Sequence, residues 1–202
     1  MTFATSLELL KFHSVAYTIY ALIIISTVAW FGYNLTRKEK VKSIVRIPFY
    51  GYMAFLVAGG VGHHIFTYNA IPWVSEDITR HHVKPDQEVN ITVSNHKWQL
   101  PPLPIKIKAG TKVFFNVESN DLIYGFGIFR KDGSMVTQMQ VDPKYKNDLL
   151  WTFHECGTFD ITSTEYSGPA QYNEKGDDLM FVKDAIVVEG CKGGDKWVLQ
   201  KT

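Results

Sequence analysis

The sequence predicts a membrane protein in which a hairpin of two transmembrane helices, residues 1–80, precedes an exported all-β Greek-key sandwich or barrel, residues 81–202. Three observations predict this fold class. Two long stretches near the N-terminus lack formally charged side chains, a short basic segment separates them, and short β-rich runs divided by turns make up the remainder. The formal net charge of +1, without a basic patch among aromatic residues, argues against nucleic-acid binding.

The first apolar stretch, residues 14–35, is long enough to cross a hydrocarbon core of about 30 Å. It lacks a basic segment ahead of it and a small-x-small cleavage site, so we expect it to be retained rather than removed as a signal peptide. The second stretch, about residues 47–70, is less apolar, and its small residues suit close packing between membrane helices. A buried helix of a soluble domain is the alternative for this second stretch.

The segment between the two stretches, residues 36–46, sets the predicted orientation. It carries several lysines and arginines against a single acidic residue, Glu39. By the positive-inside rule this loop is cytoplasmic. We therefore expect two spans in the cell (inner) membrane, surrounded by lipid, with both termini and the C-terminal domain on the extracytoplasmic side.

The β-rich region begins near Val83. Apolar and polar residues alternate over residues 89–93 and again over 113–117, which is typical of strands buried on one face. Residues 108–111 and 131–133 carry turn signals of the kind found in hairpins. Several strands at this spacing, without helical stretches between them, favour a Greek-key sandwich or barrel.

Two segments of this region resemble a known family. Residues 110–128 resemble the run G-T-x-V-x-F-x-V-x-S-x-D-V-x-H-G-F-x-I of subunit II of haem-copper oxidases, the cytochrome c and quinol oxidase subunit 2 family. Residues 163–171 align with the copper loop of that family, C-x-E-x-C-G-x-x-H. The two spans and the exported domain match its layout as well. The resemblance implies a cupredoxin-like domain and, as partners, a haem-copper catalytic subunit I and other membrane subunits.

The departures from the family pattern fall on the ligands of the binuclear copper. The positions of its two histidines, two cysteines and methionine are occupied here by Tyr124, Gln171, Ser163, Ser167 and Glu174. Hydroxyls and amides are poor copper ligands, because copper selects thiolate, thioether and imidazole. We therefore expect no cofactor in this chain, with haems and copper in the partner subunit.

The resemblance then implies a copper-free subunit II with a structural role, as in quinol oxidases, in which quinol would deliver electrons through the complex to the partner's haem. Nothing in the chain looks catalytic by itself. A nitric oxide reductase of the same superfamily is an alternative. So is a redox subunit that binds another metal through His154 and Cys156 or through paired histidines.

One family ligand remains in the loop. The resemblance implies that the Glu165 carboxylate could hold magnesium at the interface with the catalytic subunit, since a hard cation suits a carboxylate; an ordinary loop glutamate is the alternative. The only cysteines, Cys156 and Cys191, are two free thiols or one disulfide, and an oxidising exported face favours the disulfide. The histidine pairs, His63 with His64 and His81 with His82, could bind metal, contact quinone or pack against a partner.

Overall fold

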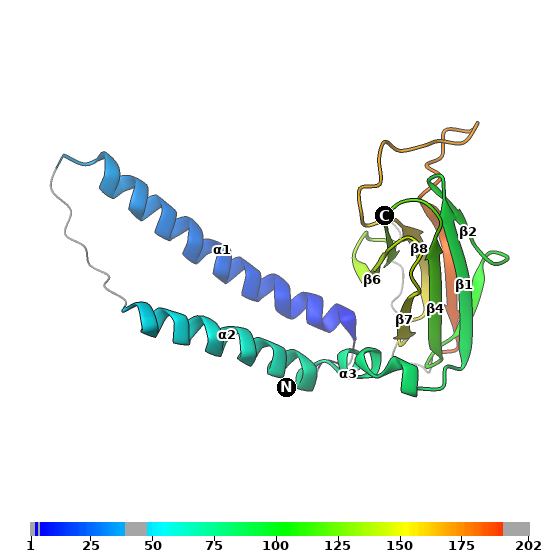
Figure 1. Cartoon of the computed structure of the whole chain (residues 1–202), viewed down its shortest axis with the longest axis horizontal. Helices are drawn as coiled ribbons and strands as arrows, with labels where there is room; N and C mark the ends of the chain where they lie inside the picture. Colours follow the sequence, from blue (N-terminus) through cyan, green and yellow to red (C-terminus); the bar gives the residue numbers. More distant parts are fainter. Residues whose placement is uncertain (1–2, 4, 39–47, 192–202) are drawn as a thin grey trace. The chain divides into compact units, whose positions relative to one another are not determined.

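The computed structural model describes residue 3, residues 5–38 and residues 48–191. The chain divides into two compact units, residues 1–72 and residues 73–202. The first unit is helical and the second contains all the strands (Figure 1). Most of the basic segment on which the predicted orientation depends, residues 39–46, lies outside the described residues, as does Ile47 at the start of the second predicted span.

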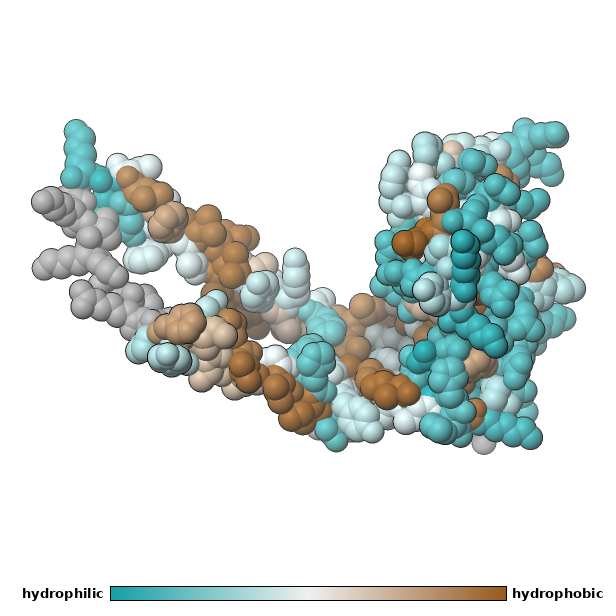
Figure 2. Space-filling model, viewed as in Figure 1, coloured by the Kyte–Doolittle hydropathy of each residue, from teal (hydrophilic) through white to brown (hydrophobic). Residues whose placement is uncertain are grey.

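The first unit contains helices α1, Ser6–Thr36, and α2, Phe49–Ala70. The Thr5 side chain caps α1 by accepting a hydrogen bond from the backbone N–H of Glu8 at 3.3 Å. Large apolar side chains are exposed along both helices and colour them brown in Figure 2. Among the described helices, α1 alone is long and apolar enough to cross a membrane. In α2 the polar pair His63 and His64 lowers the mean hydropathy, and the hairpin of two spans stays a prediction.

The second unit begins within a short helix, α3, Pro72–Ile78, which is followed by a 3₁₀ turn, η1, Arg80–His82. The sequence placed the domain boundary after residue 80, whereas residues from 73 onward pack against strands of the sandwich. The Trp73 ring meets the Trp151 ring edge to face at 5.6 Å. The Asp77 carboxylate accepts a hydrogen bond from the backbone N–H of Leu150 at 3.0 Å.

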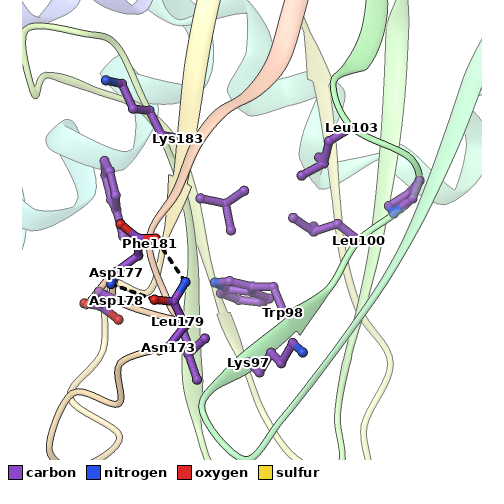
Figure 3. A pocket seen from close by; sticks show the side chains of 12 residues that line it. Lys97, Trp98, Leu100, Leu103, Asn173, Asp177, Asp178, Leu179, Phe181 and Lys183 are labelled. Atoms are coloured by element: carbon purple, nitrogen blue, oxygen red, sulfur yellow. Dashed lines mark hydrogen bonds between the residues drawn. The ribbon is translucent and has the colours of Figure 1, made fainter. Parts of the chain in front are cut away.

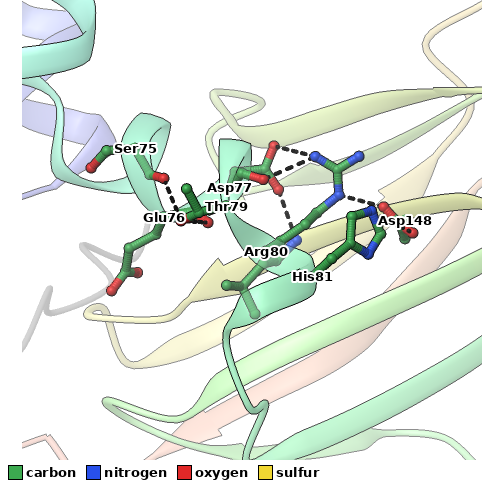
Figure 4. Close-up of polar contacts among 8 residues, drawn as sticks. Ser75, Glu76, Asp77, Thr79, Arg80, His81 and Asp148 are labelled. Carbon is green, nitrogen blue, oxygen red and sulfur yellow. Dashed lines mark hydrogen bonds and ion pairs between the residues drawn. The ribbon is translucent and has the colours of Figure 1, made fainter.

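Two ion pairs complete this attachment. Arg80 pairs with Asp148, and Lys112 pairs with Glu76 at 2.9 Å. Figure 4 shows Arg80 reaching from η1 to Asp148 while Asp77 lies on the other side of the guanidinium. Residues 73–82 therefore belong to the sandwich by their contacts.

Two sheets form the sandwich. One sheet has the order β2-β1-β4-β7 and the other the order β3-β9-β8-β5-β6. The strands are β1 Gln87–Ser94, β2 Lys97–Gln99, β3 Ile105–Lys108, β4 Lys112–Ser119, β5 Tyr124–Phe129, β6 Met135–Val141, β7 Asn147–Thr152, β8 Gly157–Thr162 and β9 Val182–Glu189. The predicted sandwich is confirmed. Two strand pairs are parallel, β1 with β4 and β3 with β9. Successive strands often lie in different sheets, so the chain crosses repeatedly between the sheets.

The predicted alternation along β1 and β4 is confirmed. Val89, Ile91 and Val93 face the core on β1, and alternate residues of β4 do the same. The core between the sheets is rich in aromatic rings; Phe115, for example, packs on Phe126 at a centroid distance of 5.4 Å. Figure 2 shows that the outer surface of the sandwich is mostly hydrophilic.

The two predicted hairpin turns have different outcomes. Residues 131–133 join β5 to β6, which pair antiparallel, so this hairpin is confirmed. Residues 108–111 do form a turn, closed by the N–H of Thr111 on the carbonyl of Lys108 at 3.0 Å. However, β3 and β4 lie in different sheets, so the expectation of a hairpin was wrong there. A turn signature specifies the reversal of the chain but not which strand pairs with which.

Candidate functional site

The loop that resembles a copper-binding loop is seated against β5. It leaves β8 after Thr162, and its first residues meet the backbone of Gly125. The N–H of Thr164 donates to the carbonyl of Gly125 at 3.1 Å, and the N–H of Gly125 donates to the Ser163 hydroxyl at 3.1 Å. A Cβ atom at Gly125 would lie 2.8 Å from the backbone nitrogens of Thr164 and Glu165. Glycine is therefore required at 125 for the loop to lie so close to the strand.

Tyr124, which aligns with the first histidine of the family pattern that the sequence resembles, has a fully buried side chain. Its phenolic oxygen accepts a hydrogen bond from the backbone N–H of His96 at 3.2 Å, and its hydroxyl is hydrogen-bonded to the Asp121 carboxylate. The same carboxylate accepts from the N–H of Asn95 at 2.6 Å. Tyr124 thus ties the turn between β1 and β2 to the turn before β5.

These contacts shift the acidity of both groups. Burial is the foremost cause that raises the pKa of Tyr124; the N–H of His96 acts against it, and the Asp121 carboxylate adds to the rise. Burial alone would raise the pKa of Asp121 as well. The hydrogen bonds from the N–H groups of Asn95 and Leu122 and from the Tyr124 hydroxyl outweigh it and lower the pKa of this carboxyl. Tyr124 is therefore held as a neutral phenol and Asp121 as a carboxylate.

His96 was not among the predicted site residues, yet its ring contacts the loop at Ser167 and Gln171. Asn95 and His96 form a two-residue turn between β1 and β2, with φ angles of 49° and 56°. The half-buried imidazole packs edge to face on Tyr124 at 6.0 Å. An Asn-His pair between two alternating segments is the signal that could have identified the turn.

Both nitrogens of this ring are engaged by the loop. Nε2 lies 2.8 Å from the carbonyl oxygen of Ser167, and Nδ1 lies 3.2 Å from the amide nitrogen of Gln171. A carbonyl only accepts, so Nε2 donates, and Nδ1 then accepts from the Gln171 amide. These contacts fit a neutral imidazole with its proton on Nε2.

The remaining predicted positions separate into two groups. The Ser167 hydroxyl donates to the carbonyl of Ile123 at 2.8 Å, and the Ser163 hydroxyl donates to the carbonyl of Glu165 at 3.0 Å. Tyr124, Ser167 and Gln171 contact His96, whereas the Ser163 hydroxyl contacts the backbone of Gly125. The side chains of Glu174 and Glu165 are both exposed.

The donor set does not fit a binuclear copper. The Ser163 and Ser167 hydroxyls are already engaged in hydrogen bonds, and the loop offers no thiolate. Across the part of the chain that the structure describes, His, Cys, Asp and Glu side chains form no group of three that could hold a metal ion. The magnesium role of Glu165 stays a prediction.

The other candidate groups lie elsewhere. Cys156 is bonded to Cys191, with Cα atoms 5.9 Å apart, so it offers no thiolate to a metal beside the exposed His154. His81 lies 3.7 Å from Asp148 in the attachment of η1. His63 and His64 are adjacent on α2, with ring centroids 6.0 Å apart.

A pocket of about 660 Å³ lies beside the loop (Figure 3). Trp98 lines it, two residues beyond His96; this ring is 5% exposed and its indole N–H donates to the carbonyl of Met180 at 2.9 Å. Leu103 and Phe181 line the pocket as well. The lining carries two lysines, Lys97 and Lys183, and two aspartates, Asp177 and Asp178, so its formal charges cancel.

No family model and no curated protein matches this chain. Among solved structures, the periplasmic domain of cytochrome oxidase subunit II from Bradyrhizobium japonicum is 14% identical, with a TM-score of 0.38, over 53% of this chain and 86% of that one. A chain of a haem-copper terminal oxidase dimer is 15% identical, with a TM-score of 0.39, over 89% and 98%. Auracyanin B is 9% identical, with a TM-score of 0.40, over 54% and 92%. Similarity at these scores is low, so the function must be inferred from the residues.

Proposed function

We propose that this chain is a copper-free subunit II of a membrane haem-copper oxidase, in which hydrogen bonds hold the loop where the family has metal ligands. The observation that carries the proposal is the joint position of Tyr124, Ser163, Ser167 and Gln171. These residues occupy family ligand positions in the sequence and converge on one loop seat in the structure.

The loss of the copper relay favours a complex that receives electrons from quinol. A relay in this domain serves electron entry from a soluble donor. Without one, quinol in the bilayer delivers electrons directly to a haem of the catalytic subunit. The role of this chain is then structural: its two helices pack in the membrane on the catalytic subunit, and its sandwich covers the extracytoplasmic face of that subunit.

The surface around the loop suits such a contact. Tyr166 at the tip of the loop is 86% exposed, and the neighbouring Leu122 and Ile123 are also exposed. The bond from Ser167 to the carbonyl of Ile123 holds these two segments together. Exposed aromatic and aliphatic side chains on adjoining segments are typical of a protein interface. Glu165, beside Tyr166, would then lie where an interfacial magnesium could bind.

The test is purification of the intact complex through a tag on this chain, followed by metal analysis and turnover measurements. We expect a haem-containing integral membrane subunit to co-purify, quinol to support oxygen reduction, and reduced cytochrome c not to support it. An electron paramagnetic resonance signal of mixed-valence binuclear copper in the complex would contradict the proposal. Reduction of nitric oxide but not of oxygen would retain the scaffold role and change the reaction class.

A further inference from the structure

The contacts of His96 support an inference beyond the lost copper. The imidazole touches three of the former ligand positions: it packs on Tyr124, donates to the carbonyl of Ser167 and accepts from Gln171. We propose that His96 is the latch that holds residues 163–171 against the sandwich. In a loop that binds a metal, the metal ion does this. The comparison with a metal rests on the proposed function, whereas the latch itself rests on these contacts.

The turn that carries His96 makes the latch rigid. A two-residue turn with positive φ at both positions usually holds asparagine or glycine, so a histidine there is strained. The backbone N–H of His96 is fixed in turn by the Tyr124 hydroxyl. His96 is thus in a strained conformation, is anchored through its backbone and is engaged through both ring nitrogens. Strain that is maintained in this way indicates a functional role for the side chain.

The loop is shaped to receive the imidazole. Gly168 has a φ of 123°, which few residues other than glycine adopt. A Cβ atom there would lie 3.1 Å from Nε2 of His96, so glycine also leaves space for the ring. Beyond the latch, the carbonyl of Gln171 accepts from the N–H of Leu179 at 2.9 Å, which extends the ordered region toward the pocket over Trp98.

The test compares His96→Asn with Asn95→Gly in the full chain in detergent micelles. Asparagine keeps the left-handed turn but is too short to reach the carbonyl of Ser167. Glycine at 95 relaxes the same turn and leaves His96 in place. Hydrogen–deuterium exchange is measured for peptides that cover residues 163–180, with peptides from β8 and β9 as internal references.

In His96→Asn we expect the loop amides, including those of Thr164 and Leu179, to exchange about tenfold faster or more, with β8 and β9 unchanged. In Asn95→Gly we expect the exchange rates of the parent. Parent rates in His96→Asn would overturn the proposal. So would equal acceleration in both variants, or acceleration spread evenly over the whole sandwich. None of these outcomes depends on the electron donor or on the metal content of the complex.

A second arm tests the link to Gln171. Gln171→Ala should accelerate exchange of the loop when His96 is present and add little when position 96 is already asparagine, because the two side chains act on the same bond. Equal acceleration by Gln171→Ala in both backgrounds would overturn the part of the latch assigned to Nδ1.

Discussion

At the scale of single residues, Tyr124 shows what would stand in place of a metal ligand under the proposed function. A ligand histidine is held by the metal and by its neighbours, whereas the Tyr124 hydroxyl joins the Asp121 carboxylate to the N–H of His96. The bond is made inside the sandwich, where an unpaired polar group is costly. The Tyr124 hydroxyl therefore attaches the β1–β2 turn to β5.

Removal of this hydroxyl should destabilise the sandwich. We expect Tyr124→Phe to lower the free energy of unfolding by about 1–2 kcal/mol, because the N–H of His96 loses its acceptor and the ring stays buried. The measurement is urea unfolding followed by circular dichroism. Tyr145→Phe is the matched control, since Tyr145 is 72% exposed. Equal effects of the two substitutions would refute the role assigned to the Tyr124 hydroxyl.

At the scale of elements, the closeness of the loop to β5 depends on glycines. Gly125 and Gly127 both face the start of the loop, and Cβ atoms there would meet Thr164. At Gly127 the nearest atoms belong to side chains, at 2.5 Å from Thr164 and 2.7 Å from Phe129. At Gly125 a Cβ atom would also clash with backbone nitrogens, which cannot move to another rotamer as a side chain can.

This difference predicts a graded response. Gly125→Ala should cost about 1–3 kcal/mol of stability and displace the loop, with a smaller effect for Gly127→Ala. Exchange of the Thr164 amide, which is bonded to the carbonyl of Gly125, reports on the displacement. If Gly127→Ala releases this amide more than Gly125→Ala does, the close approach described here is not what holds the loop.

The strands could be predicted from sequence because their alternation is local. The pairing could not: whether residues 108–111 closed a hairpin depended on β9, whose residues lie far along the chain and pair with β3. His96 was missed for a similar reason. Its position beside residues 163–171 depends on contacts between distant segments, and a lone histidine in a turn carries no signal of them.

At the scale of the whole molecule, the sandwich begins earlier than its first strand. The boundary at residue 80 followed the end of the apolar stretch, but residues 73–82 are fixed to the sandwich by specific contacts that composition does not reveal. Hydropathy identifies an apolar segment that is buried away from water. It does not tell whether the following residues pack on the next domain.

A chain that starts at Trp73 should therefore be more stable than one that starts at Val83, by at least about 2 kcal/mol. The shorter chain loses the ring contact with Trp151, the bond from Asp77 to Leu150 and the ion pair with Asp148. Urea unfolding followed by circular dichroism compares the two chains, and Asp77→Ala in the longer chain isolates one contact. Equal stabilities would show that residues 73–82 do not stabilise the sandwich.

The position of β9 has a consequence for the order in which the domain can form. Among the described strands, one sheet has all of its members once residue 152 has been made. The other cannot close until β9, the last of these strands, pairs with β3 and β8. Until then β3 has no partner in its own sheet. The bond between Cys156 and Cys191 fastens the chain just beyond β9. A ribosome or translocon that stalls before residue 182 would thus leave a half-built sandwich with an open edge, which quality-control proteases can recognise.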